Sequence, residues 1–213
     1  MLENNGALVV PRRLALLGAT GNTGRLVLQK LLAYDNPNLK LQVYVRSAKK
    51  LESLFPSLAS NRQVTVFEGS IQNEVLLREC ISGCSMIIST LGENENIPGV
   101  RVLQDFARST LKALEFLKNE TTQWIPPRLI LLSSATWNTK FAATRPAFLD
   151  WMIRNAFARP YSDLVTASEM LQTSPSLLSV LLVQPNALVK EKASGCEIST
   201  DFVYIAVSYE DLA

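Results

Sequence analysis

Short, uninterrupted apolar runs alternate along this chain with longer segments in which apolar residues recur at helical spacing. The uninterrupted runs predict parallel strands, because a strand covered by helices on both faces needs no polar side. The longer segments predict helices. The predicted strands are residues 14–17, 41–45, 64–67, 86–89, 129–132 and 178–183, and the predicted helices are residues 25–34, 48–55, 74–81, 100–118 and 147–171.

This alternation of strand and helix predicts an α/β fold. Right-handed crossovers repeated along a chain build a Rossmann-type, doubly wound parallel sheet with helices on both faces. We expect about six to seven strands, in the order 3-2-1-4-5-6. A chain of 213 residues fits one such unit. Residues 1–213 are therefore predicted to form a single dinucleotide-binding domain, in which residues 1–12 are a flexible N-terminus.

A glycine-rich segment joins the first predicted strand to the first predicted helix. Residues 18–24 read GATGNTG, with glycines at the spacing GxxGxxG. Gly18 permits a tight turn, Gly21 lets backbone approach a pyrophosphate, and Gly24 lets the helix pack closely on the sheet. The N-terminus of that helix offers free N–H groups and a positive dipole end to the phosphate. The alternative interpretation is a glycine-rich turn without a ligand.

The end of the second predicted strand indicates which dinucleotide binds. An Asp or Glu at this position holds the ribose 2′-hydroxyl of NAD, whereas an Arg receives the 2′-phosphate of NADP. Here the strand ends in VYVRS, so that Arg46 offers a planar fork of donors and Ser47 offers a hydroxyl. Lys49 and Lys50 follow, and the next carboxylate is Glu52. The sequence predicts NADP(H), with a solvated basic turn as the alternative.

Composition narrows the possible partners. A net charge of +2, from 21 basic and 19 acidic residues, gives no general attraction to nucleic acid or to a membrane. Cys80, Cys84 and Cys196 show no CxxC spacing and the chain has no His, so we expect packing thiols, a reducing compartment and no metal site. The first residues lack the pattern of a signal peptide. We therefore expect a cytoplasmic protein that acts on a small molecule.

Several segments together resemble one known family. From about Arg13 to Ala213 the chain contains LALLGATGNTGR, VYVRS, FEGS, IISTLG, LLSSAT and QPNALV. In these segments it resembles the atypical short-chain dehydrogenase/reductases, and most closely their NmrA-like, NAD(P)-binding branch with the small flavin and biliverdin reductases. The resemblance implies an NADP-dependent oxidoreductase. It also implies that the C-terminal part, which closes the substrate side in this family, is short or truncated here.

The resemblance also assigns cofactor contacts. Thr20, Asn22 and Thr23 would contact the pyrophosphate. The family commonly has Gly-Asp after the third strand, with the Asp near the adenine amine. This chain has a serine there, so that Ser70 and the backbone of Ile71 would serve instead. The remaining contacts would come from Thr90, Leu91 and Gly92 on the adenosine and ribose side, from Ser133, and from Pro185 and Asn186 near the nicotinamide carboxamide.

The expected catalytic residues are incomplete. Enzymes of this class generally use Ser, Tyr and Lys, with the Tyr and Lys one turn apart on one helix face. The ammonium lowers the pKa of the tyrosine, whose phenol then passes a proton to the substrate as hydride arrives. The resemblance matches Ser134 and Tyr161 to this set, but the lysine position holds Val165. Tyr161 is therefore a catalytic candidate, with an ordinary packing role as the alternative.

The predicted function follows from this departure. Trp137 and Phe141 come after the fifth predicted strand, at the edge where such sheets bind substrates, and would form an apolar wall or, alternatively, a plain loop core. A reductase that passes hydride from NADPH to a flat apolar acceptor, such as a flavin, quinone or conjugated carbonyl, needs no Tyr–Lys pair. The alternatives are a non-enzymatic NADP(H) sensor or scaffold that binds a protein partner, and a redox-neutral isomerase or cyclase.

Overall fold

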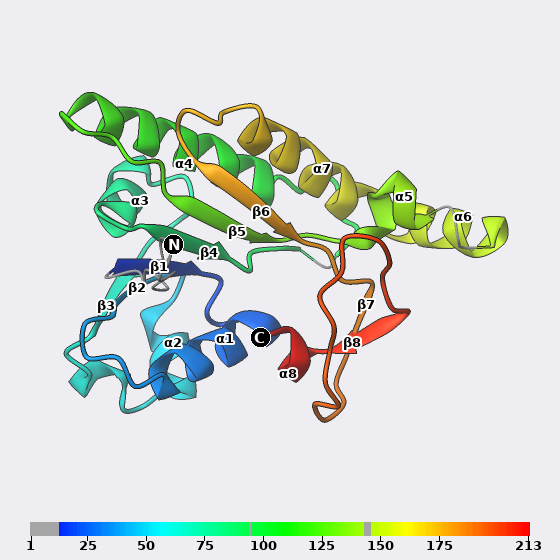
Figure 1. Ribbon diagram of the computed structural model, residues 1–213, viewed down its shortest axis with the longest axis horizontal. Helices are drawn as coiled ribbons and strands as arrows, with labels where there is room; N and C mark the ends of the chain where they lie inside the picture. Colours follow the sequence, from blue (N-terminus) through cyan, green and yellow to red (C-terminus); the bar gives the residue numbers. More distant parts are fainter. Residues whose placement is uncertain (1–12, 94, 143–145) are drawn as a thin grey trace, which may run out of the picture.

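A six-stranded parallel sheet forms the centre of the computed structural model (Figure 1). The structure describes residues 13–93, 95–142 and 146–213, so the predicted flexible segment 1–12 lies outside the described residues. The strand order is β3-β2-β1-β4-β5-β6, as predicted, and each neighbouring pair is parallel. The strands are β1 (Arg13–Leu17), β2 (Lys40–Val45), β3 (Val64–Glu68), β4 (Met86–Ser89), β5 (Arg128–Leu132) and β6 (Ser179–Val183).

The longer helices cover the sheet in two layers (Figure 1). One layer holds α1 (Asn22–Ala33) and α2 (Ala48–Leu54); the other holds α3 (Glu74–Ile81), α4 (Val102–Asn119) and α7 (Ala158–Gln172). The remaining helical segments are η1 (Leu58–Ser60), η2 (Ala135–Trp137), α5 (Thr139–Ala142), α6 (Ala147–Ala156) and α8 (Tyr209–Leu212). Among the described residues, none of the helices combines the length and apolar character needed to cross a membrane.

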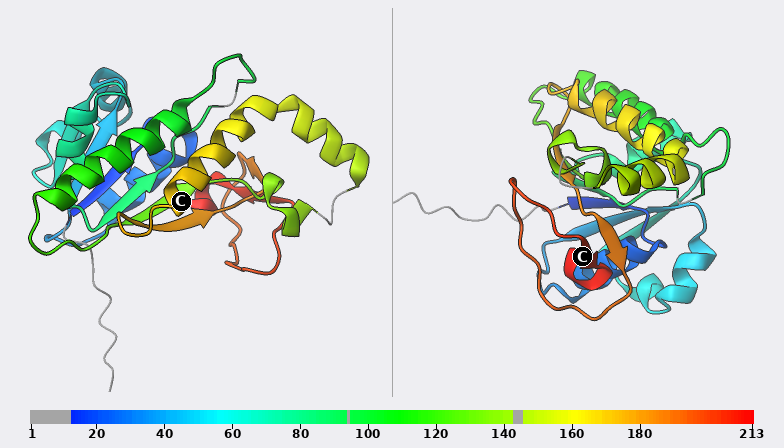
Figure 2. Two further views of the ribbon diagram at one scale, coloured as in Figure 1. Left: turned by 90° about the horizontal axis from the view of Figure 1, so that it is seen from above. Right: turned by 90° about the vertical axis from the view of Figure 1, so that its right-hand side faces the viewer.

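Two predicted helices differ from the observed ones by more than two residues. Helix α1 begins at Asn22 rather than at residue 25, because Gly21 takes an extended conformation and serves as its N-cap residue. The segment 147–171 forms two helices rather than one. Phe157 leaves the helical conformation, with φ −123° and ψ 27°, and α7 starts after it. As a result α6 lies beyond the carboxyl end of the main sheet (Figure 2).

Alternate residues of the central strand β1 face opposite helix layers. Leu14 and Leu16 pack in the core beneath α1 and α2, whereas Ala15 and Leu17 pack in the core beneath α3, α4 and α7. This double cover explains why the central strands are continuous apolar runs. The cover is incomplete at the margin of the sheet, where Leu181 of the edge strand β6 is 50% exposed.

A second, two-stranded parallel sheet was not predicted from the sequence. It pairs β7 (Ala187–Val189) with β8 (Ala206–Ser208), beside α8 (Figure 1). The Asp211 carboxylate of α8 accepts hydrogen bonds from the Ser208 hydroxyl at 2.7 Å and from the backbone N–H groups of Ser194 and the residue after it, at 3.1 and 2.9 Å. These bonds lower the pKa of Asp211. They tie the long connection between β7 and β8 to α8.

Two of the three cysteines pack in the core, as expected. Cys80 and Cys84 are buried, and the Cys84 thiol donates to Gln42 Oε1 at 2.8 Å. Burial raises the pKa of both thiols, that of Cys84 to about 12, so both stay protonated. Cys196 is exposed. Within the described ranges, no group of His, Cys, Asp and Glu side chains is arranged to hold a metal ion.

A buried carboxylate joins α7 to α4. Asp163 is 2% exposed, and it accepts hydrogen bonds from the backbone N–H groups of Leu103 at 2.8 Å and Gln104 at 3.0 Å. These donors lie in the first turn of α4, and the N-cap residue of α4, Arg101, makes no side-chain capping bond. Asp163 therefore caps α4 from a neighbouring helix and places a negative charge at the positive end of its dipole.

Replacing Asp163 by Ala should lower the free energy of unfolding by about 2–3 kcal/mol, because two buried N–H groups lose their acceptor. Asn keeps one acceptor oxygen, so Asp163→Asn should cost less. Urea unfolding measures both, with Ser162→Ala on the exposed side of α7 as the control. A midpoint for Asp163→Ala equal to that of the control would contradict the capping role.

Candidate cofactor and substrate site

A cleft of about 360 Å³ opens at the carboxyl ends of β1, β2, β3 and β4. Parallel doubly wound sheets bind their ligands at this edge, next to the point where the strand order reverses. The structure brings together nine of the residues predicted to contact the cofactor, and these line the cleft: Gly18, Thr20, Gly21, Arg46, Ser70, Ile71, Thr90, Leu91 and Gly92.

The glycine segment forms a tight turn that places the start of α1 at the cleft. Gly18 has a φ of +87°, and its carbonyl accepts a hydrogen bond from the N–H of Gly21 at 2.9 Å. A Cβ on Gly24 would lie 2.1 Å from the Gly18 oxygen and 2.5 Å from Thr90 Oγ1, so only glycine fits there. Asn22 and Thr23 form the start of α1 with Gly24, and no side chain caps this helix end from the N-cap position. The free N–H groups suit a phosphate.

Two cations lie where β2 ends. Arg46 is exposed directly after β2, and Lys50 lines the same cleft from α2. Ser47 is the N-cap residue of α2, and its Oγ accepts a hydrogen bond from the N–H of Lys50 at 3.2 Å. Ser47 thus fixes the turn that carries Arg46 and Lys50 and is not itself among the residues lining the cleft.

Tyr44 forms part of the same wall and was not predicted from the sequence. Its hydroxyl donates to the carbonyl oxygen of Ser70 at 2.8 Å and so ties β2 to the segment after β3. Burial raises the pKa of Tyr44, and the neighbouring Cys80 raises it further. The phenol therefore stays protonated and acts as a hydrogen-bond donor.

A second hollow, of about 400 Å³, lies between α7 and the carboxyl ends of β5 and β6. Three predicted residues line it: Ser133, Ser134 and Trp137. Val165, at the lysine position, lines it from α7 together with Glu169. Ser134 caps the short helix η2, and its Oγ accepts from the N–H of Thr136 at 3.2 Å.

Tyr161 lies in an aromatic cluster rather than on the lining of this hollow. Its ring packs between Trp137, at a centroid distance of 5.6 Å, and Phe157, at 6.1 Å. Its hydroxyl donates to Thr136 Oγ1 at 3.2 Å. Thr136 therefore contacts both predicted catalytic residues. Its N–H donates a hydrogen bond to Ser134 Oγ, and its Oγ1 accepts one from the Tyr161 hydroxyl.

Besides Ser47 and Tyr161, six predicted residues lie outside the described lining of the cleft and of the second hollow: Asn22, Thr23 and Gly24 at the start of α1, and Phe141, Pro185 and Asn186. The N–H of Phe141 donates to the carbonyl of Asn138 at 3.1 Å, within the turn at α5. The carbonyl of Pro185 accepts from the N–H of Ala135 at 2.9 Å. The Asn186 amide donates to the carbonyl of Tyr204 at 2.8 Å.

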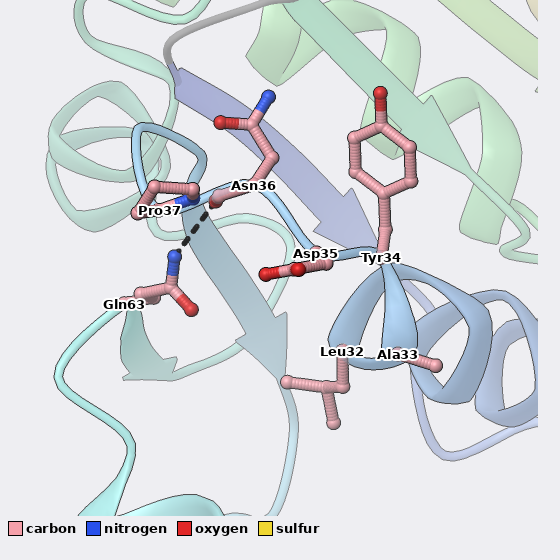
Figure 3. A pocket seen from close by; sticks show the side chains of 7 residues that line it. All are labelled: Leu32, Ala33, Tyr34, Asp35, Asn36, Pro37 and Gln63. Carbon is pink, nitrogen blue, oxygen red and sulfur yellow. Dashed lines mark hydrogen bonds between the residues drawn. The ribbon is translucent and has the colours of Figure 1, made fainter.

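A further hollow, of about 370 Å³, lies where the chain leaves α1 and enters β2 (Figure 3). Gln63 Nε2 donates to the carbonyl of Asn36 at 2.9 Å across it (Figure 3). This hollow is at the amino ends of β2 and β3, opposite the edge at which such sheets bind ligands. Its polar groups hold the loop, and we assign it no function.

The fold and the cleft together define a dinucleotide-binding protein: a doubly wound parallel sheet, a glycine turn at a helix N-terminus and cations at the end of the second strand. A family model described as NAD(P)H-binding matches residues 18–213. The chain belongs to this family of atypical short-chain dehydrogenase/reductases, as its sequence motifs indicated.

Similar proteins indicate an enzymatic activity in addition to dinucleotide binding. Oxidoreductase nsrR of Aspergillus novofumigatus is 34% identical over 204 residues, which cover 95% of this chain and 76% of that protein. Oxidoreductase aflX of Aspergillus parasiticus is 36% identical over 202 residues, covering 95% and 75%. A crystal structure of a Veillonella parvula short-chain dehydrogenase/reductase in complex with NADP has a TM-score of 0.68 and 22% identity, covering 95% of this chain and 84% of that chain. The protein is an NAD(P)H-dependent oxidoreductase of the atypical short-chain kind, so the predicted class of enzyme is confirmed.

Gly24→Ala should weaken NADPH binding by at least about tenfold, because a methyl group cannot occupy the space beside Gly18 without moving the loop. Calorimetric titration measures the affinity, and thermal unfolding shows whether the variant folds. Gly21→Ala is the companion variant: its Cβ would lie 3.3 Å from the Gly18 oxygen, which the fold tolerates more easily. Wild-type affinity in both variants would show that the phosphates bind elsewhere.

Proposed function

We propose that this protein is an NADPH-dependent reductase that passes hydride to a flat, apolar acceptor such as a flavin, a quinone or a conjugated carbonyl. The observation that carries the proposal is the pairing of a cleft at the glycine turn with a second hollow, in which Val165 occupies the lysine position. The cofactor site is built for a dinucleotide, whereas the usual proton relay is incomplete.

The preference for NADPH rests on the charges around the end of β2. Arg46 and Lys50 both line the cleft, and residues 46–51, directly after β2, include no carboxylate to hold a ribose 2′-hydroxyl. The nearby carboxylate of Glu68, at the end of β3, accepts a hydrogen bond from the N–H of Ala48 at 3.0 Å. A guanidinium binds a phosphate through two parallel hydrogen bonds, and an ammonium adds a second positive charge. The 2′-phosphate of NADPH would pair with both cations, whereas NADH has a neutral hydroxyl at that position.

The pyrophosphate and the nicotinamide half of the cofactor would lie along the carboxyl edge of the sheet. Thr20, Asn22 and Thr23 would hold the pyrophosphate at the start of α1. The nicotinamide half would extend across β4 toward Ser133, with Pro185 and Asn186 beyond it on the β6 side. When bound, NADPH supplies a hydride at the nicotinamide ring.

The acceptor would lie in the second hollow, against Trp137. Trp137 offers an apolar wall for a planar ring, and the Ser134 hydroxyl offers a hydrogen bond to an acceptor oxygen. In place of an ammonium beside Tyr161, the site has the apolar side chain of Val165. The phenol of Tyr161 is held between two aromatic rings, and its hydroxyl donates a hydrogen bond to Thr136 Oγ1. Acceptors that take their proton from water fit such a site.

The cofactor preference is tested by titrating the protein with NADPH and with NADH. NADPH should bind at least about tenfold more tightly, a difference of about 1.4 kcal/mol, and Arg46→Ala should remove most of the difference. Lys49→Ala is the matched control, because Lys49 lies in the same turn but is not among the residues lining the cleft. Equal affinities in the wild type would overturn the preference for NADPH.

The role of Tyr161 is tested by following NADPH oxidation with a naphthoquinone and with FMN as acceptors. Tyr161→Phe keeps the aromatic packing and removes only the hydroxyl, so kcat should change by less than about threefold. Loss of a general acid typically costs about a hundredfold or more. A loss of that size in Tyr161→Phe would restore Tyr161 as the proton donor and would contradict the proposed mechanism.

A further inference from the structure

A glutamine amide of fixed orientation stands in the cleft after β3. Gln72 lines the cleft beside Ser70 and Ile71. Its Nε2 donates to Asp105 Oδ2 of α4 at 2.8 Å, and its Oε1 accepts from the Ser70 hydroxyl. Asp105 also pairs with Arg108, at 3.2 Å between Oδ1 and Nη1.

The carboxylate decides which way the amide of Gln72 points. An ionised carboxylate only accepts hydrogen bonds, so the NH₂ group of Gln72 must face Asp105, and the oxygen then faces Ser70. Turning the amide over would set its oxygen against the carboxylate. These two contacts leave one lone pair on Oε1 and one N–H on Nε2, so the amide presents an acceptor and a donor side by side.

The proposed NADP(H) site places the adenine at this end of the cleft. The glycine turn after β1 would hold the pyrophosphate, and the sheet continues from β1 to β2 and then β3. Arg46 and Lys50 at the end of β2 would hold the 2′-phosphate of the adenosine ribose. The base attached to that ribose therefore reaches the end of β3, where Gln72 lies.

We propose that Gln72 recognises the adenine ring and that Asp105 is the positioning residue that fixes its amide. This inference rests on the proposed binding of NADP(H). Oε1 would accept a hydrogen bond from the 6-amino group, and Nε2 would donate to the adjacent ring nitrogen N1. A glutamine amide is complementary to this pair of groups on the Watson–Crick edge of adenine. The family resemblance implied Ser70, with the backbone of Ile71, as the adenine contact. In this assignment Ser70 orients the amide of Gln72 instead.

Hypoxanthine is the discriminating base. It carries a carbonyl oxygen where adenine has the 6-amino group, and an N–H where adenine has the bare nitrogen N1. Two oxygens would therefore meet at Oε1 and two N–H groups at Nε2 of Gln72. Only an amide turned over could bind it, and Asp105 opposes that orientation. The wild-type protein should therefore bind NADPH about tenfold more tightly than the reduced hypoxanthine analogue, nicotinamide hypoxanthine dinucleotide phosphate.

The experiment is a calorimetric titration of the wild type and three variants with both nucleotides. Gln72→Ala should reduce the preference to within about twofold, mainly by weakening NADPH binding. Asp105→Asn lets the amide turn over, because an amide partner can donate as well as accept, and the preference should fall through tighter binding of the analogue. Glu74→Gln is the matched control. It removes an ion pair with Lys112 of 2.7 Å between α3 and α4, outside the cleft, and should keep the full preference.

The outcomes separate this inference from the function on which it rests. If NADPH binds but the wild type does not discriminate between the two bases, or if Gln72→Ala keeps the preference, the inference is overturned and the NADP(H) site stands. If the wild type binds neither nucleotide, the proposed function fails and this inference fails with it. If Asp105→Asn does not fold, Gln72→Ala decides alone, because it changes an exposed loop side chain.

Discussion

The close approach of α1 to the ends of β1 and β4 is the constraint on which the rest of the site depends. Gly24 faces the carbonyl of Gly18 and the hydroxyl of Thr90 at distances that leave no room for a side chain. Thr90 is itself held by two hydrogen bonds to the carbonyl of Leu17, one from its N–H and one from its hydroxyl, both 3.0 Å. This contact sets where α1 begins. It thereby sets where a phosphate can meet free N–H groups, and the other parts of the cleft are arranged around that point.

The first turn of α4 links the two halves of the site. Asp163 binds it from α7, two residues after Tyr161, on the side of the proposed substrate hollow. Asp105, within the same turn, binds Gln72 on the side of the proposed adenine pocket. A shift of this helix end would change both hollows together. The two carboxylates therefore connect the walls of both hollows to the same helix end. This connection depends on tertiary contacts, which the local sequence pattern does not reveal.

The sequence predicted the parts of the molecule that short-range patterns determine. The apolar runs predicted all six strands of the main sheet, because burial on both faces leaves a clear signature in the central strands. The break at Phe157 was missed, since apolar side chains recur on both sides of it and periodicity does not record a change of direction. Tyr44, Lys50 and Gln72 were missed as lining residues, because their place in the cleft depends on where neighbouring strands end and on the position of α4.

The replacement of the usual lysine by Val165 has a consequence for the range of substrates. In the proposed reductase the protein positions a hydride donor but adds little acid to help the acceptor develop negative charge. An isolated ketone would have to form an alkoxide with the help of neutral donors such as the Ser134 hydroxyl, and without an ammonium at position 165. A quinone or a flavin spreads the incoming charge over its own ring system. Such a site would select its acceptors by their electron affinity at least as strongly as by their shape.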